Sequence, residues 1–172
     1  QPLQLREVFL MKNKPVFFNN HRVRKKISNI KNENDHINLY NYVDSNNILD
    51  IGFGDGDSII NTIRKGDQRI YGIESYTIGV SKVLDFINLR NIENVHVYHG
   101  DVVEIIDMFP NNFFDHVNMF FPDPWPKRRH HKRRFITKFF LDKLKTKVRG
   151  NNKVHIASDH INYIFDTKYV LT

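Results

Sequence analysis

Short runs rich in β-branched and aromatic residues alternate with helical patterns from Asn46 onward. The alternation predicts five strands, at 46–51, 69–74, 94–100, 113–121 and 152–158. Strands that are joined through helices need crossover connections, so they form a parallel sheet that is covered on both faces. The sequence therefore predicts an α/β fold with a mostly parallel sheet.

Two of the intervening segments carry clear helical periodicity. Apolar residues recur at i, i+3, i+4 and i+7 between the second and third predicted strands, at Val80, Val83, Leu84 and Ile87. A second apolar stripe precedes the last strand, at Ile136, Phe139, Phe140 and Leu144. Residues 1–45 are instead basic and show no sustained period. We expect a partly ordered arm over 1–45 and one folded domain over 46–172.

Composition narrows the chemistry that this chain can perform. The formal net charge is +7 and the chain has no cysteine. A positive surplus favours an anionic partner such as nucleic acid, while the lack of cysteine excludes disulfides and thiolate metal sites. No apolar run reaches the roughly 20 residues that span a bilayer. We expect a cytoplasmic protein without a membrane partner; the sequence leaves the oligomeric state open, with a monomer favoured.

A glycine-rich turn (Gly52–Gly56) follows the first predicted strand and precedes a helix. Gly52, Gly54 and Gly56 would let a cofactor approach the bare backbone, and Asp50 stands just before them. Glu74 closes the second strand, where a carboxylate can accept hydrogen bonds from both hydroxyls of a ribose. The pair of signals predicts a nucleoside-containing cofactor.

The spacing G-x-G-x-G and the surrounding acids distinguish between cofactors. A dinucleotide turn usually reads G-x-G-x-x-G and receives a pyrophosphate, which Asp50, Asp55 and Asp57 would repel. These carboxylates suit the sulfonium and amino groups of S-adenosylmethionine. That cofactor is favoured, with a dinucleotide or a turn without ligand as alternatives. Asp101, after the third strand, either bonds the amine of adenine or caps a helix.

A proline-rich loop (Pro122–Pro126) follows the fourth predicted strand. Its three prolines restrict it to a few extended conformations. The loop would lie at the carboxyl edge of the sheet, where open α/β folds bind their ligands, with Asp123 and Trp125 facing the reactive end of the cofactor. The alternative is a surface turn that happens to contain an acid.

A basic segment (Lys127–Arg134) comes next, with six fixed cations and two histidines in eight residues. Such a run is often only a solvated face, but its density favours contact with a nucleic-acid backbone. The adjacent histidines suggest no metal site, because neighbours in sequence point apart on a helix or strand.

Together these segments resemble the tRNA (guanine-N(7)-)-methyltransferase family. The resemblance rests on DIGFGDG, GIES and FFPDPWPKRRHHKRR, of which the last is the most specific. It implies a Rossmann-like class I methyltransferase fold, S-adenosylmethionine as cofactor, tRNA as substrate and transfer of a methyl group to guanine N(7). The N(7) atom has a free lone pair, so no strong general base is needed.

The resemblance also implies roles for individual residues. Cofactor contacts fall on Asp50, Glu74, Asp101 and Asp123, and Asp123 is also the catalytic acid. Lys127 and Asp159 would touch the substrate. The expected RNA contacts are Arg129, His130, His131, Lys132, Arg133 and Arg134.

The sequence departs from the family at two places. Asp50 stands where the family usually has Glu, and the chain ends before the family's last strands and their Thr-x-x-Glu motif. With five strands in place of seven, we expect one sheet edge to lack its usual partner. A weakly active or inactive remnant that binds RNA, a methyltransferase for another nucleic acid and a dinucleotide-dependent oxidoreductase remain alternatives.

Overall fold

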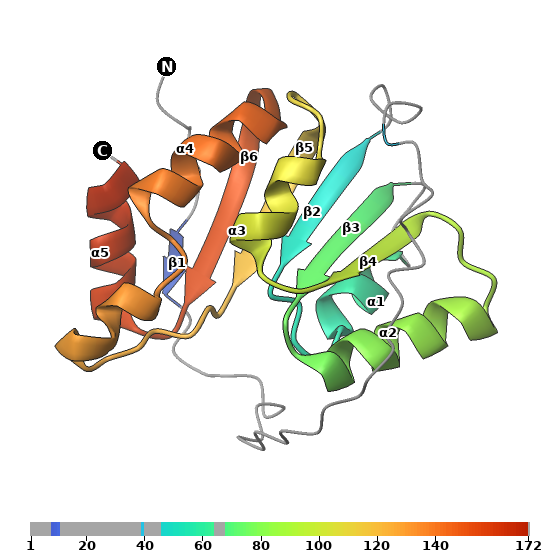
Figure 1. Cartoon of the computed structure of the whole chain (residues 1–172), viewed down its shortest axis with the longest axis horizontal. Coiled ribbons are helices and arrows are strands. Elements are labelled where there is room, and N and C mark those ends of the chain that lie inside the picture. The colour runs from blue at the N-terminus through green and yellow to red at the C-terminus, as the bar shows by residue number, and fades with distance from the viewer. Residues whose placement is uncertain (1–7, 11–38, 40–45, 64–67, 172) are drawn as a thin grey trace.

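The computed structural model describes residues 8–10, 39, 46–63 and 68–171. In this part of the chain, parallel strands form one sheet in the order β1-β6-β5-β2-β3-β4 (Figure 1). The strands are β1 (Val8–Leu10), β2 (Asn47–Ile51), β3 (Arg69–Glu74), β4 (Val95–His99), β5 (Phe114–Phe120) and β6 (Val148–Ser158). The predicted α/β class and parallel sheet are confirmed.

Helices connect successive strands from β2 to β6, and a last helix follows β6. They are α1 (Asp57–Ile63), α2 (Thr77–Leu89), α3 (Val102–Ile105), α4 (Lys138–Lys147) and α5 (Ile161–Leu171), with 3-10 turns η2 (Ile106–Met108) and η3 (Arg128–Arg133). The periodic residues Val80, Val83 and Ile87 are buried on α2, as the pattern predicts. Helix α4 begins only at Lys138, so Ile136 precedes it and is buried in the connection.

Two apolar clusters sandwich the sheet because alternate residues of each strand point to opposite faces. Ile70 packs with the α1 and α2 side chains, including Ile59 and Val83. Tyr71, its neighbour in sequence, packs with the other cluster, which reaches α4 and α5 through Phe140 and others. Strands β3 and β4 therefore contribute side chains to both clusters.

The structure adds elements that the sequence patterns did not predict. Helix α5 was not predicted, and Phe139, which was assigned to an apolar stripe, is 63% exposed. Strand β1 lies in the segment that was expected to be a partly ordered arm. The rest of residues 1–45, apart from 39, lies outside the described residues.

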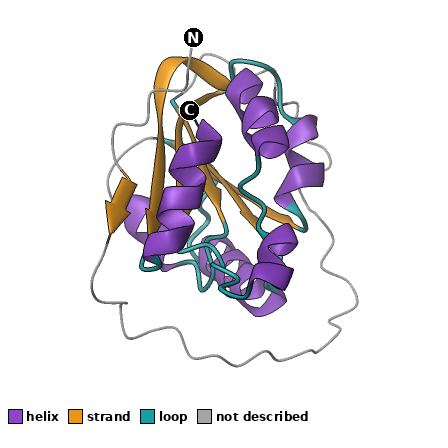
Figure 2. Cartoon of the chain, turned by 90° about the vertical axis from the view of Figure 1, so that its left-hand side faces the viewer, coloured by secondary structure: helices purple, strands orange, loops and turns teal. Residues whose placement is uncertain are grey.

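The sheet edge expected to lack its usual partner is partly covered. Strand β1 pairs in parallel with β6, and Val8 lies opposite Ile156 while Leu10 lies opposite Ser158. Figure 2 looks at this side of the molecule, with β1 and α5 towards the viewer. The expectation of an unpaired edge is wrong along these three residues, because a segment from the start of the chain takes the position.

The strand order reverses between β2 and β5. From β2 the chain moves through β3 to β4, and after crossing back it continues from β5 to β6 on the other side. Ligands of open α/β sheets bind beyond the carboxyl ends of the strands at such a switch point. The glycine-rich turn follows β2 and the proline-rich loop follows β5, so the two segments flank this place.

Candidate active site

The glycine-rich turn has a backbone that only glycine adopts readily. Gly52, Gly54 and Gly56 have φ of +71°, +57° and +86°. The Gly52 amide donates to the Ile73 carbonyl at 2.8 Å, and the Gly56 amide donates to the Phe53 carbonyl at 3.0 Å. A Cβ at Gly52 or Gly54 would meet no atom within 4 Å, so open space lies beside this backbone.

Glu74 holds the turn against the next strand. One carboxylate oxygen accepts from the Gly54 amide at 2.7 Å, and the other accepts from the amides of Ser75 at 2.7 Å and Tyr76 at 2.8 Å. The side chain is buried. Its carboxylate therefore fixes the turn and the start of α2 together, next to the place where a ligand would lie.

Close packing of α2 on the turn was not visible in the sequence. A Cβ at Gly79, inside α2, would lie 1.8 Å from the Gly54 carbonyl oxygen. A Cβ at Gly56 would lie 2.1 Å from Val83. The helix can approach the turn only because both positions lack a side chain. A glycine inside a helix was the one available signal, since such a glycine usually has a packing reason.

Asp50 is buried at the end of β2, with 2% of its surface exposed. The pKa of Asp50 is raised from 3.8 to about 7, mainly by burial; the Ser58 hydroxyl acts to lower it and the Glu74 carboxylate acts to raise it. A cation brought to this carboxylate would favour its ionised form. Asp50 is therefore poised to respond to a positively charged ligand.

Asp101 caps the short helix after β4. Its side chain accepts from the Val103 amide at 2.8 Å, and its backbone is extended as N-cap geometry requires. The helix-cap interpretation is confirmed. The residue is exposed, at the same edge of the sheet as Glu74.

The proline-rich loop is framed by two strained residues. Phe121 and Trp125 have φ of +51° and +42°, a region that costs a side-chain-bearing residue roughly 1–2 kcal/mol. The Phe121 amide donates to the Ala157 carbonyl of β6 at 2.7 Å, which anchors the start of the loop. Asp123 lies between the strained residues and is exposed.

The basic segment folds back on the proline-rich loop. The Arg133 guanidinium carbon lies 4.8 Å from the centroid of the Trp125 ring, and the His130 ring meets that ring edge-on at 5.8 Å. Four further cations of the segment are exposed, namely Lys127, Arg128, Arg129 and Lys132. A polyanion can therefore reach most of this segment.

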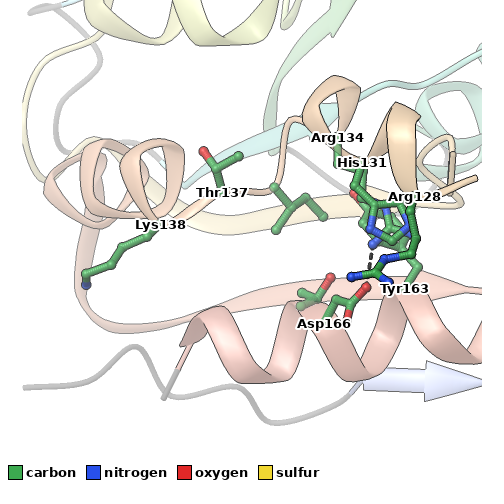
Figure 3. A pocket seen from close by; sticks show the side chains of 9 residues that line it. Arg128, His131, Arg134, Thr137, Lys138, Tyr163 and Asp166 are labelled. Carbon is green, nitrogen blue, oxygen red and sulfur yellow. Dashed lines mark hydrogen bonds and ion pairs between the residues drawn. The ribbon is translucent and has the colours of Figure 1, made fainter.

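Arg134 differs from the rest of the basic segment because it is buried. It forms an ion pair with Asp166 of α5, and its guanidinium carbon lies 4.8 Å from the centroid of the Tyr163 ring. Beside this contact lies an open pocket between η3 and the starts of α4 and α5 (Figure 3). The pocket is lined by Arg128, His131, Arg134, Ile136, Thr137, Lys138, Tyr163, Asp166 and Thr167.

Acidic residues follow the carboxyl ends of consecutive strands. Asp50 and Glu74 close β2 and β3, Asp101 follows β4, Asp123 follows β5, and Asp159 follows β6 and is half-buried. Because the strands are parallel, the topology brings all of them to one edge of the sheet. Among the described residues, no cluster of three potential metal ligands is found.

Residues 44–171 match the family model Methyltransf_4, which is described as "Putative methyltransferase". The chain belongs to this methyltransferase family. In the described ranges, no helix of this family member is long and apolar enough to cross a membrane.

Curated relatives share a more specific name, tRNA (guanine-N(7)-)-methyltransferase. The relative from Nitrosococcus oceani is 42% identical over 127 residues, which cover 73% of this chain and 54% of the relative. That from Wolbachia pipientis wMel is 39% identical over 116 residues, covering 67% and 52%. The chain spans about half the length of the curated relatives that it matches.

A solved structure shows the same fold. An N-methyltransferase of Haemonchus contortus, in complex with phosphomonomethylethanolamine and S-adenosylhomocysteine, aligns with a TM-score of 0.52 and 19% identity. The alignment covers 65% of this chain and 24% of the other. This likeness concerns the fold alone, and it confirms the predicted Rossmann-like class I methyltransferase architecture.

Proposed function

We propose that this chain carries the catalytic centre of a tRNA (guanine-N(7)-)-methyltransferase, which transfers a methyl group from S-adenosylmethionine to guanine N(7). The observation that carries the proposal is the row of acids at the carboxyl edge of the sheet, beside an open glycine-rich turn and an exposed basic segment. The names of the curated relatives support the same activity. The family match from residue 44 supports a methyltransferase domain over 46–172.

The residues around the glycine-rich turn fit this cofactor. Open space beside Gly52 and Gly54 leaves room for a ligand against the backbone. Glu74 would accept the ribose hydroxyls, Asp50 would favour a cationic group, and Asp101 would meet the adenine amine. Asp50 and Glu74 would repel the pyrophosphate of a dinucleotide, which makes an oxidoreductase the weaker alternative.

Asp123 is the proposed catalytic residue. When bound, S-adenosylmethionine supplies an electrophilic methyl group on its sulfonium. The lone pair of guanine N(7) can form the new bond directly, so the chain needs to orient the base and not to deprotonate it. Asp123 would hold the Watson–Crick edge of guanine and offset the positive charge that develops on the ring. Asp159, at the end of β6, would assist in holding the substrate.

The exposed cations of the basic segment would bind the tRNA backbone. Lys127 follows the proline-rich loop directly, which suits contact with the nucleotide being modified. Arg129, Lys132 and Arg133 are exposed and would each neutralise a phosphate. A tRNA substrate is consistent with the expected cytoplasmic location.

The decisive experiment is transfer of labelled methyl from S-adenosylmethionine to unmodified tRNA, with the product nucleoside identified by mass. We expect 7-methylguanosine. A different methylated nucleoside would move the proposal to another substrate atom. Intact binding of cofactor and RNA without any product would instead identify a binding remnant and overturn the proposed activity.

Two variants tie the activity to the proposed residue. Asp123→Ala should lower turnover at least about 100-fold with the cofactor still bound, because the charge on guanine is then no longer offset. Asp85→Ala, which removes an exposed acid of α2, should leave turnover unchanged. Equal turnover in Asp123→Ala and the wild type would remove Asp123 from this role.

A further inference from the structure

The last cation of the basic segment is not available to a phosphate in the way its neighbours are. Only 7% of the Arg134 side chain is exposed, whereas Arg129, Lys132 and Arg133 are exposed residues. A phosphate contact needs an accessible guanidinium. Its place in the basic segment therefore does not make Arg134 a phosphate contact.

Arg134 joins three separate pieces of the site. Its Nε donates to the Pro124 carbonyl at 2.8 Å, and its Nη1 pairs with the Asp166 carboxylate of α5. Its guanidinium also lies over the Tyr163 ring. Figure 3 shows the pair between Arg134 and Asp166 above α5, with Tyr163 beside it. One side chain thus fastens the proline-rich loop to a helix that follows β6.

The hydrogen bond to Pro124 acts at a decisive place in the loop. The Pro124 carbonyl belongs to the peptide unit that leads into Trp125, the residue with φ of +42°. Fixing this peptide plane restricts Pro124 ψ and Trp125 φ together. The Phe121 amide is already bound to Ala157 of β6. Asp123 therefore lies between two anchored points, one on β6 and one on Arg134.

Electrostatics place Asp123 near the same helix. Burial raises the pKa of Tyr163, Arg134 lowers it, and the Asp123 carboxylate raises it. Asp123 and Arg134 are therefore both close enough to act on the same phenol. Helix α5 forms the support behind the loop, and Tyr163 is buried within that support.

We propose that Arg134 is a positioning residue that braces the proline-rich loop on Asp166 of α5 and so sets the place of Asp123. RNA contact is left to the exposed cations. This proposal rests on the function proposed above for Asp123. The opposing possibility is that Arg134 binds RNA through the pocket it shares with Arg128, His131 and Lys138.

The test compares Arg134→Lys and Asp166→Asn with Lys132→Ala as the RNA-contact control. Arg134→Lys keeps the charge but loses the planar group that bonds Pro124 and Asp166 at once. Asp166→Asn weakens the same brace from a side chain that is 55% exposed, so the fold should survive. Circular dichroism and thermal melting check this for each variant.

Three readouts separate a brace from a phosphate contact. We expect both brace variants to lower kcat about 10-fold or more with little change in KM for tRNA. The slope of log affinity against log salt should stay at its wild-type value in both. Lys132→Ala should lower that slope by about one and raise KM for tRNA.

Fluorescence tests the brace without any methyl transfer. Trp125 is the only tryptophan of the chain and lies in the loop. Its emission maximum and its quenching by acrylamide should shift alike in Arg134→Lys and Asp166→Asn, and not in Lys132→Ala. This readout stands even if the wild type proves inactive.

The proposal is overturned if Arg134→Lys and Asp166→Asn leave Trp125 emission and kcat unchanged. It is equally overturned if Arg134→Ala lowers the salt slope by about one with Trp125 emission intact, because Arg134 would then be a phosphate contact.

Discussion

The glycine-rich turn and the proline-rich loop face each other across the switch point, and they are held in place by different means. The turn is fixed by main-chain dihedrals and by Glu74, which accepts amides of Gly54, Ser75 and Tyr76. The loop is fixed by distant side chains and strands, through Arg134, Asp166 and Ala157. The turn is braced from the neighbouring strand β3, whereas the loop is braced from β6 and α5 on the other side of the switch point.

This difference has a consequence for what each half can tolerate. A contact inside the turn also belongs to the core of the first βα units, so its loss should cost stability. Apart from the buried Arg134, the residues of the loop and of the basic segment are exposed or half-buried, so their loss should alter function while the fold persists. Substitutions in the two regions therefore test the comparison directly.

The largest effect on stability is expected for Glu74→Ala. Three part-buried amides lose their charged acceptor, and a hydrogen bond to a charged group contributes about 1.5–3 kcal/mol, so a loss of roughly 3–5 kcal/mol is expected for the three together. Denaturant unfolding measures it, with Glu104→Ala at an exposed acid of α3 as control. A loss below about 1 kcal/mol would show that the turn does not depend on Glu74.

Asp50 should make stability depend on pH. Its pKa of about 7 lies above the ordinary 3.8 of the unfolded state, so the folded state binds the proton more tightly. The unfolding free energy should therefore fall by about 1.4 kcal/mol per unit as pH rises from roughly 4 to 7. Asp50→Asn should lack this contribution.

His96 acts with the opposite sign over part of the same range. Burial lowers its pKa from 6.5 to about 4, with the charge of Arg69 acting in the same direction, so its contribution to stability rises with pH between these values. The difference between wild type and Asp50→Asn isolates the carboxylate, because His96 is common to both. A difference that does not vary between about pH 5 and 7 would contradict the prediction.

A smaller loss of stability than for Glu74→Ala is expected for Gly79→Ala. Alanine normally stabilises a helix by about 1 kcal/mol over glycine. Here its Cβ would lie 1.8 Å from the Gly54 carbonyl oxygen, a main-chain atom that cannot rotate away. We expect destabilisation by about 1–3 kcal/mol and weaker cofactor binding. Asp85→Ala in the same helix is the matched control, and a stabilised Gly79→Ala variant would disprove close packing of α2 on the turn.

The smallest effect on stability is expected for Arg133→Ala in the basic segment. An exposed cation over an aromatic ring contributes about 0.5–1 kcal/mol, so the unfolding free energy should change little. RNA affinity should fall, and its dependence on log salt should flatten by about one. Titration at several salt concentrations measures this. A destabilisation as large as that of Glu74→Ala would erase the distinction between the two regions.

Sequence reasoning succeeded where local chemistry decides the structure. The strand and helix alternation, the glycine-rich turn and the acid that closes β3 all follow from residues close together in the chain. It was less successful where long-range packing decides. It did not predict helix α5 or strand β1, and it placed the start of α4 too early. The limits of these elements depend on what lies across the sheet. Gly79 went unnoticed because its constraint is the Gly54 carbonyl oxygen, 25 positions earlier.

The sequence by itself determined the parallel α/β class, the open turn with its carboxylates and the presence of a dense basic segment. These depend on periodicity, on glycine dihedrals and on charge, which are properties of the residues themselves. The tertiary structure alone decided which cation of that segment is buried. Arg134 and Asp166 are 32 positions apart, and only the placement of α5 against the proline-rich loop brings their charges together.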